Sequence, residues 1–155
     1  MLWTKILIAF DSSQGSWRAV EYVGQMFGRV DGIKVNLLWV YDKVPEYDMV
    51  ETPFTDQVKG RILALERAKQ EGIQKMEEAV KHLKRMGIDE DSVSIKPLEK
   101  KKGVAKDIAN EALRGEYGTI ILGGTGKSGT TNALLGSVSS GVIGSLKGAA
   151  VVIVD

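Results

Sequence analysis

Residues Lys5-Ile6-Leu7-Ile8-Ala9-Phe10-Asp11 form a continuous apolar run that ends at an acidic residue. Such a run is typical of a strand that is buried on both faces, as in the middle of a parallel sheet. The turn that follows is rich in capping side chains, and Ser13 or Ser16 is placed to cap the next helix. Apolar residues then recur at helical spacing over 16–28, and residues 33–41 form a second apolar strand. The chain therefore begins with a strand, a helix and a strand.

The same alternation continues to the end of the sequence. A polar segment without periodicity, residues 42–57, separates the second strand from the next helix. Pro97 restricts the third strand to an edge of the sheet, because proline lacks the backbone donor that a central strand needs. The remaining elements are expected as a helix over 58–86, a strand over 92–98, a helix over 103–114, a strand over 119–122, a helix over 137–146 and a strand over 149–154.

This order of elements predicts an α/β fold with one open, five-stranded parallel sheet and helices on both faces. Right-handed crossovers leave few topologies, and we expect the Rossmann- or flavodoxin-like strand order 3-2-1-4-5, with the first strand central. The length of 155 residues predicts a single domain that spans residues 1–155. Ligands of such sheets bind beyond the carboxyl ends of the strands, where the winding reverses. This reversal is expected to bring Asp11 and Gly123 to one crevice.

Composition argues against several classes of protein. The formal net charge is +1, which disfavours a nucleic-acid binder that works through bulk charge. Cysteine is absent, which excludes disulfides, thiol catalysis and Cys-based metal sites. No apolar run approaches the roughly 18 residues that span a bilayer, so we expect a cytoplasmic protein without a membrane partner. The one histidine, His82, is expected to be solvated, which leaves no obvious general base.

Glycine is the unusual residue, with 18 copies in the chain, of which ten lie in residues 115–155. Five of these ten lie in the segment after the fourth strand, which reads Gly123-Gly-Thr-Gly-Lys-Ser-Gly-Thr-Thr-Asn-Ala-Leu-Leu-Gly-Ser137. Backbone N–H groups without side chains beside them, followed by a helix N-terminus, form an anion site. Lys127 adds a positive charge, and Ser128 and Ser137 add hydroxyl donors. The segment therefore predicts binding of a phosphorylated ligand.

Two familiar phosphate-binding motifs do not match this segment. A Walker A loop needs a glycine five positions before Gly126, where this chain has Ile121. The spacing of Gly124, Gly126 and Gly129 is that of a dinucleotide fingerprint, but no βαβ unit with an acidic residue about 20 positions on follows it. The chemistry of the segment thus indicates phosphate binding by another kind of loop.

The spacing Gly123-x2-Gly126-x9-Gly136-Ser137 resembles the motif that the ATP-binding branch of the universal stress protein family carries after its fourth strand. The similarity extends through most of the chain and includes Lys5–Tyr22, Leu38–Tyr41, Gly103–Ile108 and Gly136–Val138. The chain departs from the family pattern at Trp39, where His is frequent, at Gly124-Thr125, where a polar pair is usual, and at Gly148-Ala149-Ala150, where proline is common. These departures leave the motif glycines in place.

The resemblance implies a nucleotide site with ATP as its ligand. Asp11 and the backbone near Ala9 and Val40 would hold adenine and ribose, while the glycines would let the loop pass close to ribose and phosphates. A divalent ion, Mg²⁺ or Mn²⁺, would bridge the phosphates. The residues implied in nucleotide binding are Ala9, Phe10, Asp11, Val40, Leu122, Gly123, Gly126, Lys127, Ser128, Gly136, Ser137 and Val138.

The resemblance also implies a function, namely that of an ATP-binding regulatory protein of the stress response. The family's last strand often pairs across a homodimer, which here would involve residues 149–154. Two alternatives stay open: a slow Mg²⁺-dependent ATPase or phosphotransferase in the same pocket, and a structural dimer without nucleotide. The lack of a Walker B acid and of a placed base favours regulation over catalysis. Asp11 could also be no more than a turn residue that caps the first helix.

Overall fold

The structure, a computed structural model, describes residues 1–44, 55–124 and 135–155. Within these residues, one sheet is formed by β1 (Leu2–Ala9), β2 (Lys34–Tyr41), β3 (Val93–Glu99), β4 (Tyr117–Gly123) and β5 (Ala150–Val154). The strand order is β3-β2-β1-β4-β5, and every pair of neighbours is parallel. The predicted fold class and strand order are therefore confirmed, as is the edge position of β3.

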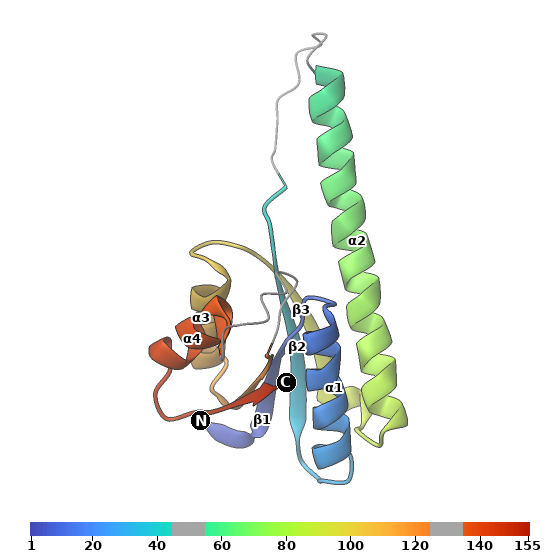
Figure 1. Ribbon diagram of the computed structural model, residues 1–155. Helices are drawn as coiled ribbons and strands as arrows, with labels where there is room; N and C mark the ends of the chain where they lie inside the picture. Colours follow the sequence, from blue (N-terminus) through green and yellow to red (C-terminus); the bar gives the residue numbers. More distant parts are fainter. Residues whose placement is uncertain (45–54, 125–134) are drawn as a thin grey trace.

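The helices form two layers, one on each face of the sheet. They are α1 (Gln14–Phe27), α2 (Thr55–Arg85), α3 (Val104–Arg114) and α4 (Ser137–Ser145), with a short 3-10 helix, η1 (Glu90–Ser92), before β3. Figure 1 shows α1 and α2 on one side of the sheet and α3 and α4 on the other. None of the helices in the described ranges is long and apolar enough to cross a membrane.

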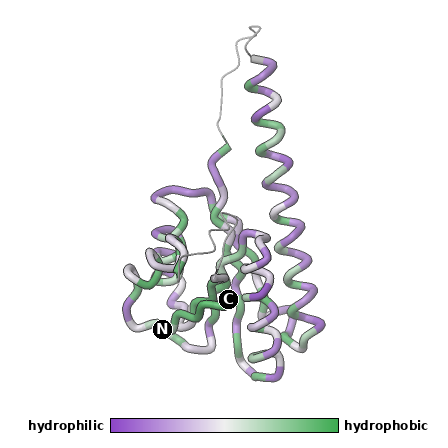
Figure 2. Tube along the Cα trace, viewed as in Figure 1, coloured by the Kyte–Doolittle hydropathy of each residue, from purple (hydrophilic) through white to green (hydrophobic). Residues whose placement is uncertain are grey.

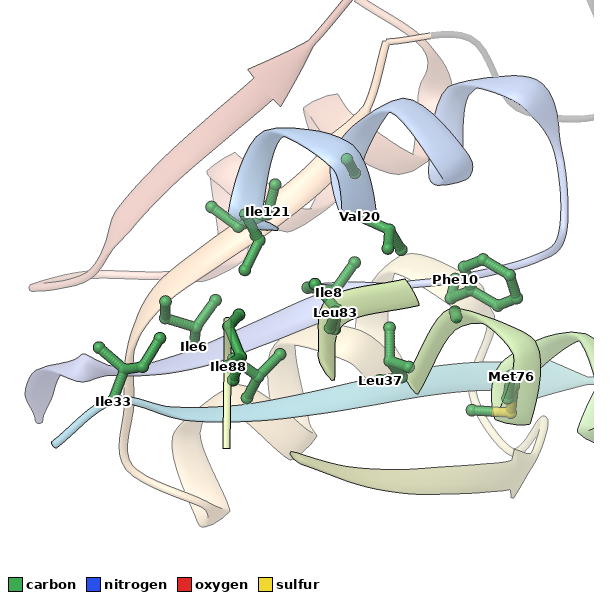
Figure 3. Packing of buried hydrophobic residues seen from close by; sticks show 14 residues of the cluster. Ile6, Ile8, Phe10, Val20, Ile33, Leu37, Met76, Leu83, Ile88 and Ile121 are labelled. Atoms are coloured by element: carbon green, nitrogen blue, oxygen red, sulfur yellow. The ribbon is translucent and has the colours of Figure 1, made fainter. Parts of the chain in front are cut away.

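The strands separate two hydrophobic clusters because successive side chains point to opposite faces. Ile6 and Ile8 of β1 face α1 and α2, whereas Leu7 between them faces α3 and α4. Figure 3 shows the first cluster, in which Ile8 of the sheet lies close to Val20 of α1 and Leu83 of α2. This alternation explains why the buried part of the first strand, residues 6–8, is apolar without interruption, as the sequence indicates.

Helix α2 packs its buried residues against the sheet in its second half. Met76 and Leu83 are fully buried in that half, while Leu63 in the first half is 58% exposed. Figure 1 shows the first half extending beyond the sheet, and Figure 2 shows that polar residues predominate along the helix. At Gly72, an added Cβ would lie 2.2 Å from the Trp39 ring, so only glycine permits this close approach of α2 to β2.

The expectation that His82 is solvated holds only in part, because 32% of its side chain stays exposed while α1 packs against it. Its Nε2 atom lies 2.5 Å from a carboxylate oxygen of Glu21 on α1, and its ring lies edge-on to Trp17. The hydrogen bond with His82 is the main cause that lowers the pKa of Glu21 below its ordinary value of 4.5. Helical periodicity places His82 on the polar side of α2, but it does not reveal that α1 packs beside that position.

The two halves of α2 make a test of this packing possible. Leu83→Ala is expected to lower the free energy of unfolding by about 2–5 kcal/mol, because it leaves a cavity in the first cluster. Leu63→Ala, a change of the same chemistry on the exposed half, is expected to alter it by less than about 0.5 kcal/mol. Urea denaturation followed by tryptophan fluorescence measures both values. Similar losses in the two variants would contradict the placement of α2.

Candidate functional site

The winding of the sheet reverses between β1 and β4. From β1 the chain passes to β2 and β3 on one side, and it then returns to β4 and β5 on the other side. Ile8 pairs with Leu37 on one side and with Ile121 on the other, so the carboxyl ends of three strands lie next to one another. A reversal of this kind leaves a crevice at the carboxyl edge of the sheet.

The turn between β1 and α1 forms one border of the crevice. Asp11 Oδ1 accepts a hydrogen bond from the Ser13 N–H at 2.9 Å, and Ser13 Oγ accepts one from the Ser16 N–H at 3.2 Å. Ser13 is therefore the capping residue of α1, and Asp11 stabilises the turn that leads to it. Between them, Ser12 adopts a left-handed conformation with φ of 61°, which is uncommon outside glycine.

Gly123, the last residue of β4, lies directly against the first turn of α1. A Cβ on Gly123 would be 2.4 Å from the Gly15 carbonyl carbon and 2.8 Å from the Ser16 nitrogen. Backbone atoms occupy this space and have no rotamer through which to move aside, so glycine is required for packing. The family resemblance implies that Gly123 gives room to a ligand, whereas the structure adds a requirement within the protein itself.

The start of α4 forms another border of the crevice. Gly136 is its capping position, and glycine has no side chain with which to cap the helix. The first N–H groups of a helix have no partner within the helix and carry partial positive charge. Unlike Gly123, Gly136 has no close neighbour among the described residues, since the nearest of their atoms to a Cβ there would be the Gly124 carbonyl oxygen, at 3.8 Å. The start of α4 is thus accessible to a ligand from the crevice.

These elements surround a pocket with about 680 Å³ of empty space, including the space at its open mouth. Most of its apolar lining comes from strands and helices on the α3 side of the sheet and includes Leu38, Val40, Val104, Ile108, Leu122 and Val138. Its polar lining comes from the turn after β1 and the start of α4 and includes Asp11, Ser13, Ser16, Ser137 and Ser139. Such a combination suits a ligand with an apolar ring system at one end and polar or anionic groups at the other.

The structure brings together the predicted site residues that it describes. The residues that line the pocket are Ala9, Phe10, Asp11, Val40, Leu122, Gly123, Gly136, Ser137 and Val138. The other three predicted residues, Gly126, Lys127 and Ser128, lie outside the described residues. The lining also includes residues that were not predicted for the site, namely Ser13, Ser16, Leu38, Trp39, Val104, Ile108, Gly124 and Ser139. For Val104 and Ile108 the sequence does contain a signal, because helical periodicity places both on the side of α3 that faces the sheet.

The described part of the pocket offers little acid–base chemistry. Asp11 is the only titratable side chain among the described lining residues. The described residues also contain no group of three or more His, Cys, Asp or Glu side chains that could hold a metal ion. The groups that the arrangement offers to a ligand are backbone N–H groups, hydroxyls and one carboxylate.

Comparison with known proteins identifies relatives of the chain. A model of the universal stress protein family matches residues 3–154, whereas a search of curated proteins gives no match.

Solved structures with a similar fold include a hypothetical protein whose biochemical function was assigned from its structure. It shares 25% identity with this chain at a TM-score of 0.76, and the match covers 99% of this chain and 96% of that chain. The universal stress protein from Archaeoglobus fulgidus in complex with dAMP matches at 17% identity and a TM-score of 0.62, with both chains covered completely. A universal stress protein family member from Arabidopsis thaliana with AMP bound matches at 14% identity and a TM-score of 0.61, over 97% of this chain and 90% of that chain.

The two glycines at the borders of the pocket are expected to respond differently to substitution. Gly123→Ala should lower the free energy of unfolding by about 1–3 kcal/mol, because its methyl group meets the backbone of α1. Gly136→Ala should cost less than about 1 kcal/mol, because its methyl group meets no close neighbour among the described residues and only the capping preference changes. Thermal unfolding of the ligand-free variants measures both effects. A larger loss in Gly136→Ala than in Gly123→Ala would contradict the packing described here.

Proposed function

The chain belongs to the universal stress protein family, and on this basis we propose that it binds an adenine nucleotide, ATP, in the pocket between β1 and β4. The main support is the meeting of the motif residues Gly123, Gly136 and Ser137 with Asp11 and Val40 in one pocket. The dAMP and AMP named for two related structures support the choice of an adenine nucleotide.

In the proposed complex, the adenine ring lies against the apolar lining near Val40 and Leu122, and Asp11 accepts hydrogen bonds from the ribose hydroxyls. The phosphates lie at the start of α4, where Gly136, Ser137 and Val138 provide backbone N–H groups and a hydroxyl. The position suits them because a helix N-terminus favours negative charge, and Gly136 brings no side chain of its own to this end of α4. Gly126, Lys127 and Ser128 belong to the proposed site through the sequence motif alone.

A divalent ion, Mg²⁺ or Mn²⁺, is part of the proposal as a ligand of the phosphates. Mg²⁺ commonly binds through substrate phosphates with few protein ligands. The described residues fit this arrangement, because Asp11 is the only carboxylate among those that line the pocket. The bound ion would offset the phosphate charge and keep the chain of phosphates in one conformation.

We further propose that the bound nucleotide serves regulation in the stress response. The described lining offers positioning groups and one carboxylate, and no observation on it favours the alternative of a slow ATPase or phosphotransferase. A homodimer through β5 is proposed as well, because this apolar strand is an edge of the sheet and its five residues are only half-buried. A measurement of the protein's molecular mass in solution distinguishes a monomer from the proposed homodimer.

Asp11→Asn gives a sharp test of the nucleotide site. The asparagine oxygen can still accept the bond from Ser13, so the turn persists while the charge at the ribose is lost. Isothermal titration calorimetry with ATP and Mg²⁺ should show about a tenfold weaker affinity, since a hydrogen bond to a charged group contributes about 1.5–3 kcal/mol.

Asp31→Asn is the matched control, because this aspartate is exposed and lies outside the lining of the pocket. It should bind ATP as the unchanged protein does. Absence of ATP binding by the unchanged protein would reject the proposed site. Equal affinities in all three proteins would leave Asp11 with the turn-stabilising role alone.

A further inference from the structure

The start of α3 contributes part of the apolar lining of the pocket. Val104, the first residue of the helix, and Ile108, one turn later, both line it. The helix begins after Gly103, which has φ of 118° and provides no side chain to cap the free N–H groups. An N-terminal turn without a capping side chain lacks a contact that commonly contributes about 1 kcal/mol to helix stability.

Asp107, in the first turn, does not cap these N–H groups but reaches back to the loop before the helix. Its carboxylate oxygens accept hydrogen bonds from the backbone N–H of Lys101 at 2.8 Å and of Lys102 at 3.1 and 3.2 Å. Asp107 is only 4% exposed, and it does not belong to the lining of the pocket. A buried carboxylate thus fastens the loop to the first turn, with Val104 between the two attachment points.

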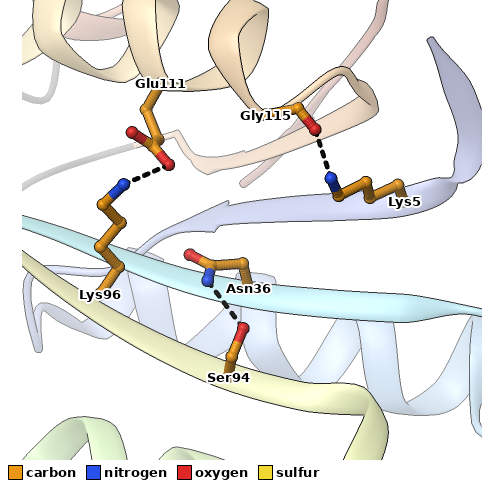
Figure 4. A network of polar contacts seen from close by, with 6 residues as sticks. All are labelled: Lys5, Asn36, Ser94, Lys96, Glu111 and Gly115. Carbon is orange, nitrogen blue, oxygen red and sulfur yellow. Dashed lines mark hydrogen bonds and ion pairs between the residues drawn. The ribbon is translucent and has the colours of Figure 1, made fainter.

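The other end of α3 is held by separate contacts. Lys5 of β1 donates to the Gly115 carbonyl at the end of the helix, with a distance of 2.5 Å, and Lys96 of β3 forms an ion pair with Glu111 at 2.7 Å. Figure 4 shows these contacts between the last turn of α3 and the strands. Loss of Asp107 would therefore release the first turn, while the rest of the helix stays on the sheet.

We infer that Asp107 is a positioning residue for the nucleoside end of the ligand. The inference rests on the proposed function and deepens it. Asp107 holds Val104 and Ile108 at a fixed distance from Val40 and Leu122, so that a flat base has apolar surface on more than one side. The phosphate end of the ligand lies at the start of α4, with whose described residues Asp107 forms no hydrogen bond, although Ala105 in the first turn of α3 packs against Gly141 of α4. The residue therefore contributes to affinity for the nucleoside and little to affinity for phosphate.

Binding measurements with two probes separate this role from a general effect on stability. Calorimetry with AMP should give about a tenfold higher dissociation constant for Asp107→Ala, since hydrogen bonds to a buried carboxylate are lost. Asp107→Asn, which keeps one acceptor oxygen, should lie between this variant and the unchanged protein. Inorganic triphosphate, measured as a competitor of ATP, should bind all three proteins with affinities within about twofold of each other, because this probe lacks the nucleoside.

Asp89→Ala is the matched control for these variants. Asp89 likewise accepts a bond from a backbone N–H, that of Asp91, and caps η1, but it does not line the pocket. The control should bind both probes normally. The inference is overturned if Asp107→Ala binds AMP normally, or if its affinity for triphosphate falls by the same factor as its affinity for AMP.

Hydrogen exchange followed by NMR tests the same contact without a ligand. In Asp107→Ala, the amide protons of Lys101 and Lys102 should exchange at least about tenfold faster, whereas those of residues 109–114 should not change. Unchanged exchange at Lys101 and Lys102 would overturn the inference while leaving the proposed function intact. Failure of the unchanged protein to bind any nucleotide would instead reject the proposed function, and with it a role for Asp107 in binding.

Discussion

The backbone contact between Gly123 and the first turn of α1 is the constraint on which the pocket depends. Because Gly123 has no side chain, the end of β4 can touch Gly15 and Ser16 at the point where the sheet reverses its winding. This contact places the turn after β1 beside the end of β4. Asp11 and the start of α4 thereby reach the same pocket although they are far apart in the sequence.

The two faces of the sheet differ in how they are covered: one forms a hydrophobic core with its helices, and the other contributes to the pocket. On the α1 and α2 face, hydrophobic packing is supplemented by close contacts such as Gly72 against Trp39 and His82 against Glu21 and Trp17. On the α3 and α4 face, part of the apolar surface of β2 and β4 stays accessible and lines the pocket. The protein can therefore keep an open, partly apolar pocket because the opposite face provides a dense core.

The sequence predicts the order of elements and the strand order because apolar runs and turn residues are local signals. It also predicts much of the pocket lining, since the glycine motif and the end of the first strand both mark the carboxyl edge. It does not reveal the partner of His82, because helical periodicity shows only which side of α2 is polar. It does not reveal the bonds of Asp107 either, because a loop without periodicity precedes α3. Both missed contacts depend on how separate segments approach each other in three dimensions.

A crystal structure of the chain grown with ATP and Mg²⁺ tests the central claim most directly. We expect electron density for adenosine between Val40, Leu122 and the start of α3, with the phosphates at Gly136 and Ser137. Density for the nucleotide at another surface, or an empty pocket in crystals that contain saturating ATP, would contradict it.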